Sequence, residues 1–485
     1  MSSAGWSRRE ALRGAALLLA AGVAARARPA WAADYHADVI VLGAGLAGLG
    51  GAYLLADQGM RVLVLEASQR VGGRMRSEKI DAQIFELGAS ELGSNYGRVI
   101  DLANRVGVKF GPRQSGYADF SYHIGGRTLK ASDWPAAPEN RTVGAEREIP
   151  AHLLESRIFG RLNPFGDDVA DWLDTRNAGL DISAADFLRG RQVSPAAIEL
   201  MSVATDYTDL ESTSALALLR DLARSVLGGF KPDSKQPQYG GNSFVFAFSD
   251  GAESLPRALA AKLGDRVSTG KIVTRIESDD SRAEVSCLDG SRYRAPFVLC
   301  TLPFSTLQRV QFSPELPAAQ AEAITAARYG GTTHVILESS APFWEADGFG
   351  PSMFTDGPLE RMFAVQNPDK SIRFLRVWVN GTGADRIDQL PADQLTKYVI
   401  AEIERMRPAA RGKLRPRLQF SWGRQPFIAG HKHVFAPGQV TRFARNMDQP
   451  WRRVHFAGEH LRRMEFGMES AMETAERAVS AILTT

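Results

Sequence analysis

Three closely spaced glycines and a later glutamate are the residue types that bind a dinucleotide. Gly43, Gly45 and Gly48 follow the apolar run Val39–Leu42, and Glu66 ends a second apolar run. The first glycine permits a tight turn, the second lets the backbone approach a pyrophosphate, and the third lets a helix pack closely on the strand. A carboxylate roughly 20 residues further on accepts hydrogen bonds from ribose hydroxyls. The spacing therefore predicts a dinucleotide site, against the alternative of a strand–turn–helix unit that binds nothing.

Two strands and one helix must position these residues. The β-branched run Val39–Leu42 is typical of a strand buried on both faces, and residues 61–66 predict a second strand. Between them a helical pattern begins near Leu46 and Ala47, so that its free N–H groups and positive dipole end face the phosphates. Ala67, directly after the glutamate, belongs to the same predicted site.

Length and composition indicate a globular protein of two or three domains. The chain has 485 residues, of which 44% are hydrophobic and 23% charged. Its net charge of +3, from 58 basic and 55 acidic residues, gives no reason to expect nucleic acid as a partner. Cys287 and Cys300 are the only cysteines, and no C-x-x-C or Cys/His cluster predicts a metal site. We expect two buried, inert thiols, although export from the cytoplasm would permit a disulfide.

The first 33 residues resemble a twin-arginine export signal. Arg8 and Arg9 precede an uncharged, mostly apolar run over residues 14–25, and Ala30-Trp31-Ala32 is an A-x-A cleavage pattern. This predicts the twin-arginine export machinery as a partner and a periplasmic or secreted location. The alternative, a membrane anchor, is disfavoured because the run is shorter than the roughly 20 apolar residues that a bilayer core requires.

The remaining chain predicts two interleaved domains. Glycine- and proline-rich connections alternate with helical stretches between about residues 111 and 240, whereas strand patterns flank this segment. We expect a dinucleotide-binding domain built from residues 34–110, 241–303 and 429–485. A substrate domain would comprise residues 111–240, which are predicted as helical, and 304–428. The predicted fold class is α/β, or α+β for the chain as a whole.

The stretch Leu65-Glu66-Ala67-Ser68-Gln69-Arg70-Val71-Gly72-Gly73-Arg74 resembles the extended flavin signature of the FAD-dependent amine oxidases, the family of monoamine and polyamine oxidases. Similar blocks follow in the family's order at residues 251–256, 273–303, 329–344 and 456–477. The resemblance implies a Rossmann-like FAD domain of the glutathione-reductase type, interleaved with a substrate domain made of a sheet and helices.

The resemblance also implies roles for individual residues. The three glycines of the first turn would hold the FAD pyrophosphate and Glu66 the adenosine ribose. The other residues that it places around the cofactor are Arg74 at the phosphates or flavin, Gly88 and Ala89, Val273 at the adenine, Gly458 and Glu459 near the ribityl chain, and Gly467 and Met468 at the flavin pyrimidine.

Four positions bear on the substrate and the electron acceptor. His334 stands where the family usually has a lysine that holds a water near the flavin N5; the alternative is a histidine satisfied inside a strand. His431 and Gly467 fall where the family's two cage aromatics stand, and Trp422 packs the second domain or walls the cavity. Gly430 occupies the position of the cysteine in covalently flavinylated members, so we expect noncovalent FAD.

Taken with the export signal, the resemblance implies an exported FAD-dependent amine oxidase or amine dehydrogenase. A hydride would pass from the carbon bearing the amine to the flavin, the imine would hydrolyse, and oxygen or a periplasmic redox protein would take the electrons. Three alternatives stay open: an L-amino-acid oxidase-like enzyme, a flavin desaturase or porphyrinogen oxidase-like enzyme, and a non-catalytic flavin-binding redox partner. The oligomeric state, a homodimer included, stays open as well.

Overall fold

The fold is that of a computed structural model, which describes residues 36–93, 95–112, 116–117, 119–166, 169–203, 205–227 and 245–485. The predicted export signal lies outside these ranges. Within them, residues 36–485 form one compact unit of mixed helices and sheets, which confirms the predicted fold class.

A five-stranded parallel sheet collects strands from distant parts of the sequence. Its order is β11-β2-β1-β15-β24, with bounds Val267–Ser268, Val62–Leu65, Val39–Leu42, Phe297–Cys300 and Val454–Phe456. Every neighbouring pair is parallel. The carboxyl ends of β1 and β2 therefore lie side by side, which brings the first glycine turn next to Glu66.

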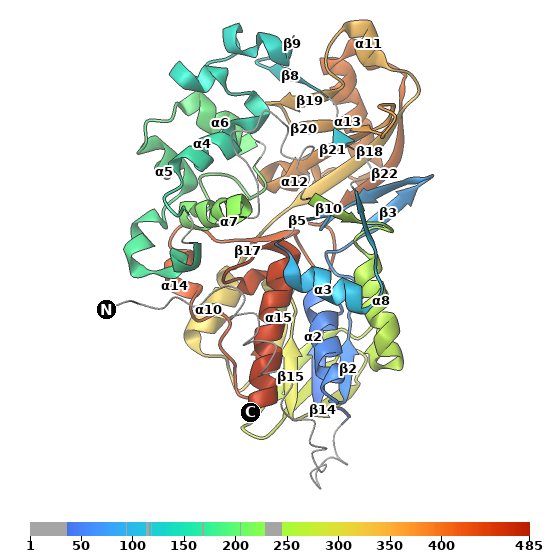
Figure 1. Ribbon diagram of the computed structural model, residues 1–485, viewed down its shortest axis with the longest axis vertical. Helices are drawn as coiled ribbons and strands as arrows, with labels where there is room; N and C mark the ends of the chain where they lie inside the picture. Colours follow the sequence, from blue (N-terminus) through green and yellow to red (C-terminus); the bar gives the residue numbers. More distant parts are fainter. Residues whose placement is uncertain are drawn as a thin grey trace, which may run out of the picture. The chain divides into compact units, whose positions relative to one another are not determined.

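Strand β1 is buried on both faces, as its apolar run predicts. Val39 and Val41 contribute to one hydrophobic core, whereas Ile40 and Leu42 contribute to another. The first core is covered by helices α2 (Leu46–Asp57), α3 (Gly97–Arg105), α8 (Ser254–Leu263) and α15 (Gly467–Thr484). Figure 1 shows α15 beside α2, so the last helix of the chain packs against the first one described.

A four-stranded sheet shares the second core. Its order is β14-β13-β12-β16, with bounds Arg292–Ala295, Ala283–Cys287, Val273–Ser278 and Gln311–Ser313. Smaller strand groups are β5 (Glu91–Gly93), β10 (Val245–Phe248) and β6 (Phe110–Pro112), the hairpin β3 (Ser77–Ile80) and β4 (Gln83–Glu86), and the pair β17 (Arg328–Gly330) and β23 (Lys432–Val434).

An eight-stranded sheet forms the second large layer. Along its main path the order is β22-β18-β21-β20-β19-β8-β9, with bounds Leu414–Ser421, Thr332–Ser339, Ile372–Asn380, Arg361–Gln366, Ser352–Thr355, Phe120–Ile124 and Arg127–Lys130, while β7 (Gly116–Tyr117) pairs with β20. Helices α11 (Phe343–Asp347), α12 (Gly381–Ile387) and α13 (Ala392–Met406) accompany this sheet. Strands β7, β8 and β9 fall in the segment predicted as helical, so that prediction was incomplete.

Helices fill the rest of that segment. They are α4 (Leu154–Leu162), α5 (Ala184–Arg189), α6 (Pro195–Val203) and α7 (Ala215–Leu227), with 3₁₀ segments at Ala131–Ala136, Gly144–Glu148, Ala151–Leu153, Val169–Leu173 and Thr175–Leu180. Short helices elsewhere are α9 (Phe304–Leu307), α10 (Ala318–Ala326) and α14 (Gln439–Phe443), with 3₁₀ segments at Gly264–Arg266, Pro408–Ala410 and Glu459–Leu461. In the described ranges, no helix combines the length and the apolar character needed to span a bilayer. The boundaries of the two interleaved domains stay a prediction.

Candidate cofactor site and substrate cavity

The glycines after β1 form a tight turn into α2. Gly43 has φ +97°, a left-handed conformation that favours glycine. A Cβ on Gly48 would lie 1.9 Å from the carbonyl oxygen of Gly43, so a larger residue would push the helix away from the turn. Leu46 and Ala47 are the first residues of α2, and no side chain caps this helix N-terminus. The positive end of its dipole is therefore left to face an anion.

The second pair of glycines packs against this turn. The Gly72 N–H donates to the carbonyl of Ala44 at 2.8 Å, and a Cβ on Gly73 would lie 3.1 Å from the Cα of Gly45. A Cβ on Gly45 itself would meet no protein atom closer than 3.9 Å, so contacts within the protein do not demand glycine there. Close approach of a pyrophosphate to the backbone does demand it. The two turns thus fit a dinucleotide.

Glu66 and Ala67 lie beside the first turn, at the end of β2. One carboxylate oxygen of Glu66 accepts the Ala44 N–H at 2.7 Å, and a carboxylate has further acceptor positions for ribose hydroxyls. The carbonyl of Glu66 accepts the N–H of Lys271 at 2.8 Å. That contact brings Val273, two residues later at the start of β12, to the adenosine end of the predicted site.

Arg74 and Glu459, from opposite ends of the sequence, form an ion pair. Arg74 Nη1 lies 2.8 Å from Glu459 Oε2, and Arg462 Nη1 lies 3.3 Å from the other carboxylate oxygen. Burial alone would raise the pKa of Glu459, but the two guanidinium groups outweigh it and lower the pKa to about 2. The carboxylate is therefore ionised at neutral pH. Gly458, directly before it, has φ +138°.

Gly88 and Ala89 lie against the backbone of Arg74. A Cβ on Gly88 would come within 2.0 Å of the Arg74 carbonyl oxygen, and that oxygen accepts the Ala89 N–H at 3.2 Å. This contact joins the third predicted cofactor block to the second glycine turn.

His334 and Trp422 converge on the carbonyl of Leu87, the residue before Gly88. His334 Nε2 donates to this oxygen at 3.1 Å, and Trp422 Nε1 donates to it as well. Burial, helped by the nearby guanidinium of Arg376, lowers the pKa of His334 well below its usual value. His334 is thus a neutral imidazole in β18 that bonds the backbone of a predicted cofactor block. Its role toward a water at the flavin stays a prediction.

Gly467 and Met468 begin α15, and aromatic rings lie beside them. Gly467 has φ +60°, and a Cβ there would lie 3.1 Å from the Tyr96 hydroxyl. The ring of Tyr96 meets that of Phe466 edge to face, with centroids 6.0 Å apart. Tyr96 and Phe466 therefore stand next to the position at which the sequence lacks a cage aromatic.

His431 is tied to the same region through its backbone and its ring. Arg74 Nη1 donates to the His431 carbonyl at 3.0 Å. The ring Nδ1 lies 2.7 Å from Thr332 Oγ1 and 3.1 Å from the carbonyl of Gly330. Burial is the main influence on the pKa of His431 and lowers it to about 4, so this ring is neutral at pH 7.

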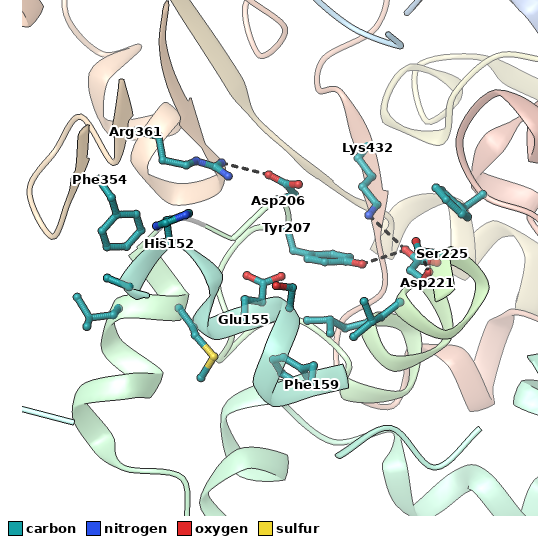
Figure 2. Close-up of a pocket in the computed structure, with 17 residues that line it drawn as sticks. His152, Glu155, Phe159, Asp206, Tyr207, Asp221, Ser225, Phe354, Arg361 and Lys432 are labelled. Carbon is teal, nitrogen blue, oxygen red and sulfur yellow. Dashed lines mark hydrogen bonds and ion pairs between the residues drawn. The ribbon is translucent and has the colours of Figure 1, made fainter. Parts of the chain in front are cut away.

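A cavity of about 240 Å³ lies next to the segments that contain His431 and Gly467 (Figure 2). Lys432, which follows His431, and Phe466, which precedes Gly467, both line it. Apolar side chains of α4, α6 and α7 form part of the wall: Phe159, Leu200, Met201, Leu218 and Leu222. The ionisable groups of the wall are His152, Glu155, Asp206, Asp221, Arg361 and Lys432, together with the phenol of Tyr207.

Both cations of the cavity wall are engaged in ion pairs. Arg361 lies 3.1 Å from Asp206, and Lys432 lies 3.2 Å from Asp221. The Tyr207 hydroxyl donates to Asp221 at 3.0 Å, and the Lys432 ammonium stands 3.9 Å from the centre of the Tyr207 ring. Figure 2 shows Arg361 toward one side of the cavity and Lys432 toward the other, with Tyr207 between them.

A chain of hydrogen bonds links the cavity to His431. Asn380 Nδ2 donates to Asp206 at 2.8 Å, and Thr332 Oγ1 donates to Asn380 Oδ1 at 2.9 Å. The same Thr332 oxygen is the one that contacts the His431 ring. The position of the Asp206 carboxylate is therefore coupled to that of the imidazole.

The structure places Glu66, Arg74, Gly88 and Ala89 around the two glycine turns, and the residues next to His431 and Gly467, Lys432 and Phe466, line the cavity. The sequence predictions omitted the charged residues of the wall. The only indication of cavity-wall residues in the sequence is that Lys432 follows His431 and Phe466 precedes Gly467, two positions predicted to lie near the substrate. The two cysteines are free and buried, so no disulfide joins them.

Comparison with known proteins is in accord with this geometry. The family model for flavin containing amine oxidoreductases matches residues 46–483, and the chain belongs to that family. The flavin-dependent L-tryptophan oxidase RebO of Lentzea aerocolonigenes is 26% identical over 92% of this chain and 98% of its own length. Amine oxidase [flavin-containing] B of Homo sapiens is 24% identical over 92% of this chain and 86% of its own length.

Solved structures share the fold. Wild-type putrescine oxidase bound to putrescine has a TM-score of 0.74 and 21% identity, over 93% of this chain and 99% of that one. Cyclohexylamine oxidase from Brevibacterium oxydans IH-35A has a TM-score of 0.72 and 22% identity, over 92% and 99%. The cofactor of this chain is FAD, as the sequence predicts.

Proposed function

We propose that this member of the flavin containing amine oxidoreductase family oxidises the C–N bond of an amine held in the cavity beside Lys432 and Phe466. The observation that carries the proposal is that the cavity borders the two segments that the family resemblance places at the flavin, around His431 and Gly467. A substrate in this cavity would lie against the reactive end of the cofactor.

The bound FAD would accept a hydride, with its two electrons, from the carbon that bears the amine. The nitrogen lone pair then forms the C=N bond, a proton leaves the nitrogen, and water hydrolyses the imine to a carbonyl compound. The protein contributes positioning and a partly apolar wall that excludes water. His431 is neutral at pH 7, so it places no positive charge beside an amine that must be unprotonated to react.

A second candidate is the oxidation of an amino acid. The curated relatives named as L-amino-acid or L-tryptophan oxidases support it, and the Arg361 guanidinium in the cavity wall is a suitable partner for a carboxylate. Binding a substrate carboxylate there would require Arg361 to share its contact with Asp206.

Three further features belong to the proposal. FAD would be held noncovalently, because Gly430 has no side chain for a covalent link and a Cβ there would come within 2.5 Å of the Tyr329 Cβ. Oxygen or a redox protein would reoxidise the flavin. Export by the twin-arginine pathway to the periplasm or beyond is supported by Arg8, Arg9 and the A-x-A pattern.

The test is anaerobic bleaching of the bound flavin. Purified protein is mixed with a panel of primary and secondary amines and with a panel of L-amino acids, and the loss of oxidised-flavin absorbance is followed. The proposal expects bleaching by at least one amine. Bleaching by amino acids alone would favour the second candidate, and a flavin reduced by neither panel would refute both.

A further inference from the structure

The hydrogen bonds around His431 decide which of its ring nitrogens carries the hydrogen. Trp378 Nε1, which can only donate, gives its hydrogen to Asn380 Oδ1 at 2.7 Å. That contact fixes the orientation of the Asn380 amide, so Oδ1 is also an acceptor toward Thr332 Oγ1, which lies 2.9 Å away. The single hydrogen of the Thr332 hydroxyl therefore points to Asn380.

His431 Nδ1 is consequently the donor in its own contacts. The Thr332 hydroxyl, 2.7 Å from Nδ1, has only lone pairs left to offer it, and the carbonyl of Gly330, 3.1 Å from Nδ1, is likewise an acceptor. Because burial lowers the pKa of His431 to about 4, the neutral ring has a single N–H at pH 7. With the hydrogen on Nδ1, the other ring nitrogen, Nε2, carries an unprotonated lone pair.

The Nε2 lone pair has no hydrogen-bond partner in the part of the chain that the structure describes. His431 is only partly covered by protein atoms, yet burial is the main influence on its pKa, so its accessible part faces an internal space rather than bulk solvent. The carbonyl of His431 accepts a hydrogen bond from Arg74 in the second glycine turn, and the next residue, Lys432, lines the cavity. His431 thus stands between a predicted cofactor block and the cavity.

An acceptor at this place has a direct use in the oxidation of an amine. When a hydride leaves the carbon that bears the nitrogen, the nitrogen lone pair forms the C=N bond and the nitrogen becomes positively charged. Its N–H group is then a stronger donor than in the neutral amine, so a fixed acceptor stabilises the transition state more than the bound substrate. The imidazole of His431 is too weak a base to keep the proton, which passes to water.

We propose that His431 is a catalytic residue whose Nε2 accepts a hydrogen bond from the N–H of the reacting amine, and that Thr332 is the positioning residue that holds the ring in this form. The inference rests on the proposed function and adds a requirement for the substrate. The neutral amine must carry at least one N–H, as primary and secondary amines do, whereas tertiary amines lack this donor.

The experiment follows anaerobic flavin reduction in the holoenzyme at pH 8, where His431 is neutral. The substrates are butylamine, N-methylbutylamine and N,N-dimethylbutylamine, which in the neutral form carry two, one and no N–H. For each amine the apparent second-order rate constant of the wild type is divided by that of His431→Phe, so that the amine's own pKa and reactivity cancel. We expect ratios of about 10 to 100 for the first two amines, the range for a hydrogen bond to a charged group, and a ratio below about 3 for the third.

Variants of two neighbouring threonines test the positioning role. Thr332→Val removes the hydroxyl that holds Nδ1, and it should lower the constants for butylamine and N-methylbutylamine about 3- to 10-fold without changing that for the tertiary amine. Thr332→Ser keeps a hydroxyl and should restore the wild-type constants. Thr333→Val is the matched control on β18: its hydroxyl donates to Asp388 at 2.8 Å, and its loss should change none of the constants.

Two results would overturn the inference. One is a ratio below about 3 for butylamine, and the other is an equal ratio for all three amines, which would indicate a lost shape rather than a lost acceptor. If the tertiary amine bleaches neither protein, the variants of Thr332 decide, and equal constants in Thr332→Val and Thr332→Ser contradict the proposal.

The failure of the proposed function gives a different result. If none of the amines bleaches the flavin of the wild type, oxidation of amines is refuted, and calorimetric binding of butylamine to the holoenzyme decides the inference. Binding that is at least about 10-fold weaker in His431→Phe than in the wild type supports the hydrogen bond, whereas equal binding or no binding overturns it.

Discussion

Glu459→Gln tests the ion pairs that join the two ends of the chain. Glu459 is buried and contacts Arg74 at 2.8 Å and Arg462 at 3.3 Å. Lowering its pKa from 4.5 to about 2 corresponds to roughly 3 kcal/mol of stability at pH 7, at about 1.36 kcal/mol per unit. The amide keeps the shape but removes the negative charge from both guanidinium groups, of which Arg462 retains Asp221 at 3.6 Å, and breaking a buried pair costs about 3–5 kcal/mol. We therefore expect the variant to lose about 3 kcal/mol.

The pH dependence of this loss has a definite sign. A carboxylate whose pKa is lower in the folded than in the unfolded protein stabilises the fold fully above its unfolded pKa, and the stabilisation disappears as the pH falls toward its folded pKa. For Glu459 the window lies between about pH 4.5 and 2. The difference between wild type and variant should accordingly be constant from pH 8 to 5 and shrink only below that.

Urea unfolding at saturating FAD measures the difference, after subtraction of the part that a changed FAD affinity contributes, which is RT times the logarithm of the ratio of the two dissociation constants. Glu78→Gln is the matched control: its partner Arg76 lies 2.7 Å away, but both side chains are about one-third exposed, so the loss should stay below about 1 kcal/mol. A loss below about 1 kcal/mol for Glu459→Gln at pH 7, or a difference that already halves between pH 8 and 6, would refute the reasoning.

Gly48→Ala should yield protein without bound FAD, because its Cβ would lie 1.9 Å from a backbone oxygen. Gly97→Ala is the control: its Cβ would meet open space, so the variant should keep all of its FAD. The flavin absorbance per protein chain measures the FAD content of both variants. Burial raises the pKa of Cys300 to about 12 and also raises that of Cys287, so neither thiol of the native protein should react with a disulfide reagent at pH 8, and both should react after unfolding. His334→Lys should accelerate reoxidation of the reduced flavin by oxygen in stopped flow, because an ammonium replaces a neutral imidazole; an unchanged rate contradicts a role for this position in that step.

The cofactor half of the molecule was predictable because its constraints are local. The run Val39–Leu42 is typical of a buried strand without any knowledge of its neighbours. Gly43 is favoured by its own φ of +97°, and Gly48 by the carbonyl oxygen of Gly43, five residues earlier. The pairing of the two glycine turns was also within reach, because both belong to one family signature.

The cavity was not predictable because its residues are assembled over long distances. Strand β8 joins the large sheet by pairing with β19, more than 200 residues later, and nothing local in Phe120–Ile124 specifies that partner. From the sequence alone, Glu155 would be expected to be an ordinary exposed glutamate of a helix. The packing of α4 places it at the cavity instead. Asp206 and Arg361, which are 155 positions apart, show no sequence signal of their ion pair.

A chain of alternating positive and negative side chains connects the cavity wall to the cofactor site. Lys432 contacts Asp221 at 3.2 Å, Asp221 lies 3.6 Å from Arg462, Arg462 pairs with Glu459, and Glu459 pairs with Arg74 beside the glycine turn. Each buried charge in this path needs the next, since removing one partner leaves an uncompensated charge. The cavity wall therefore cannot shift far without disturbing the cofactor block.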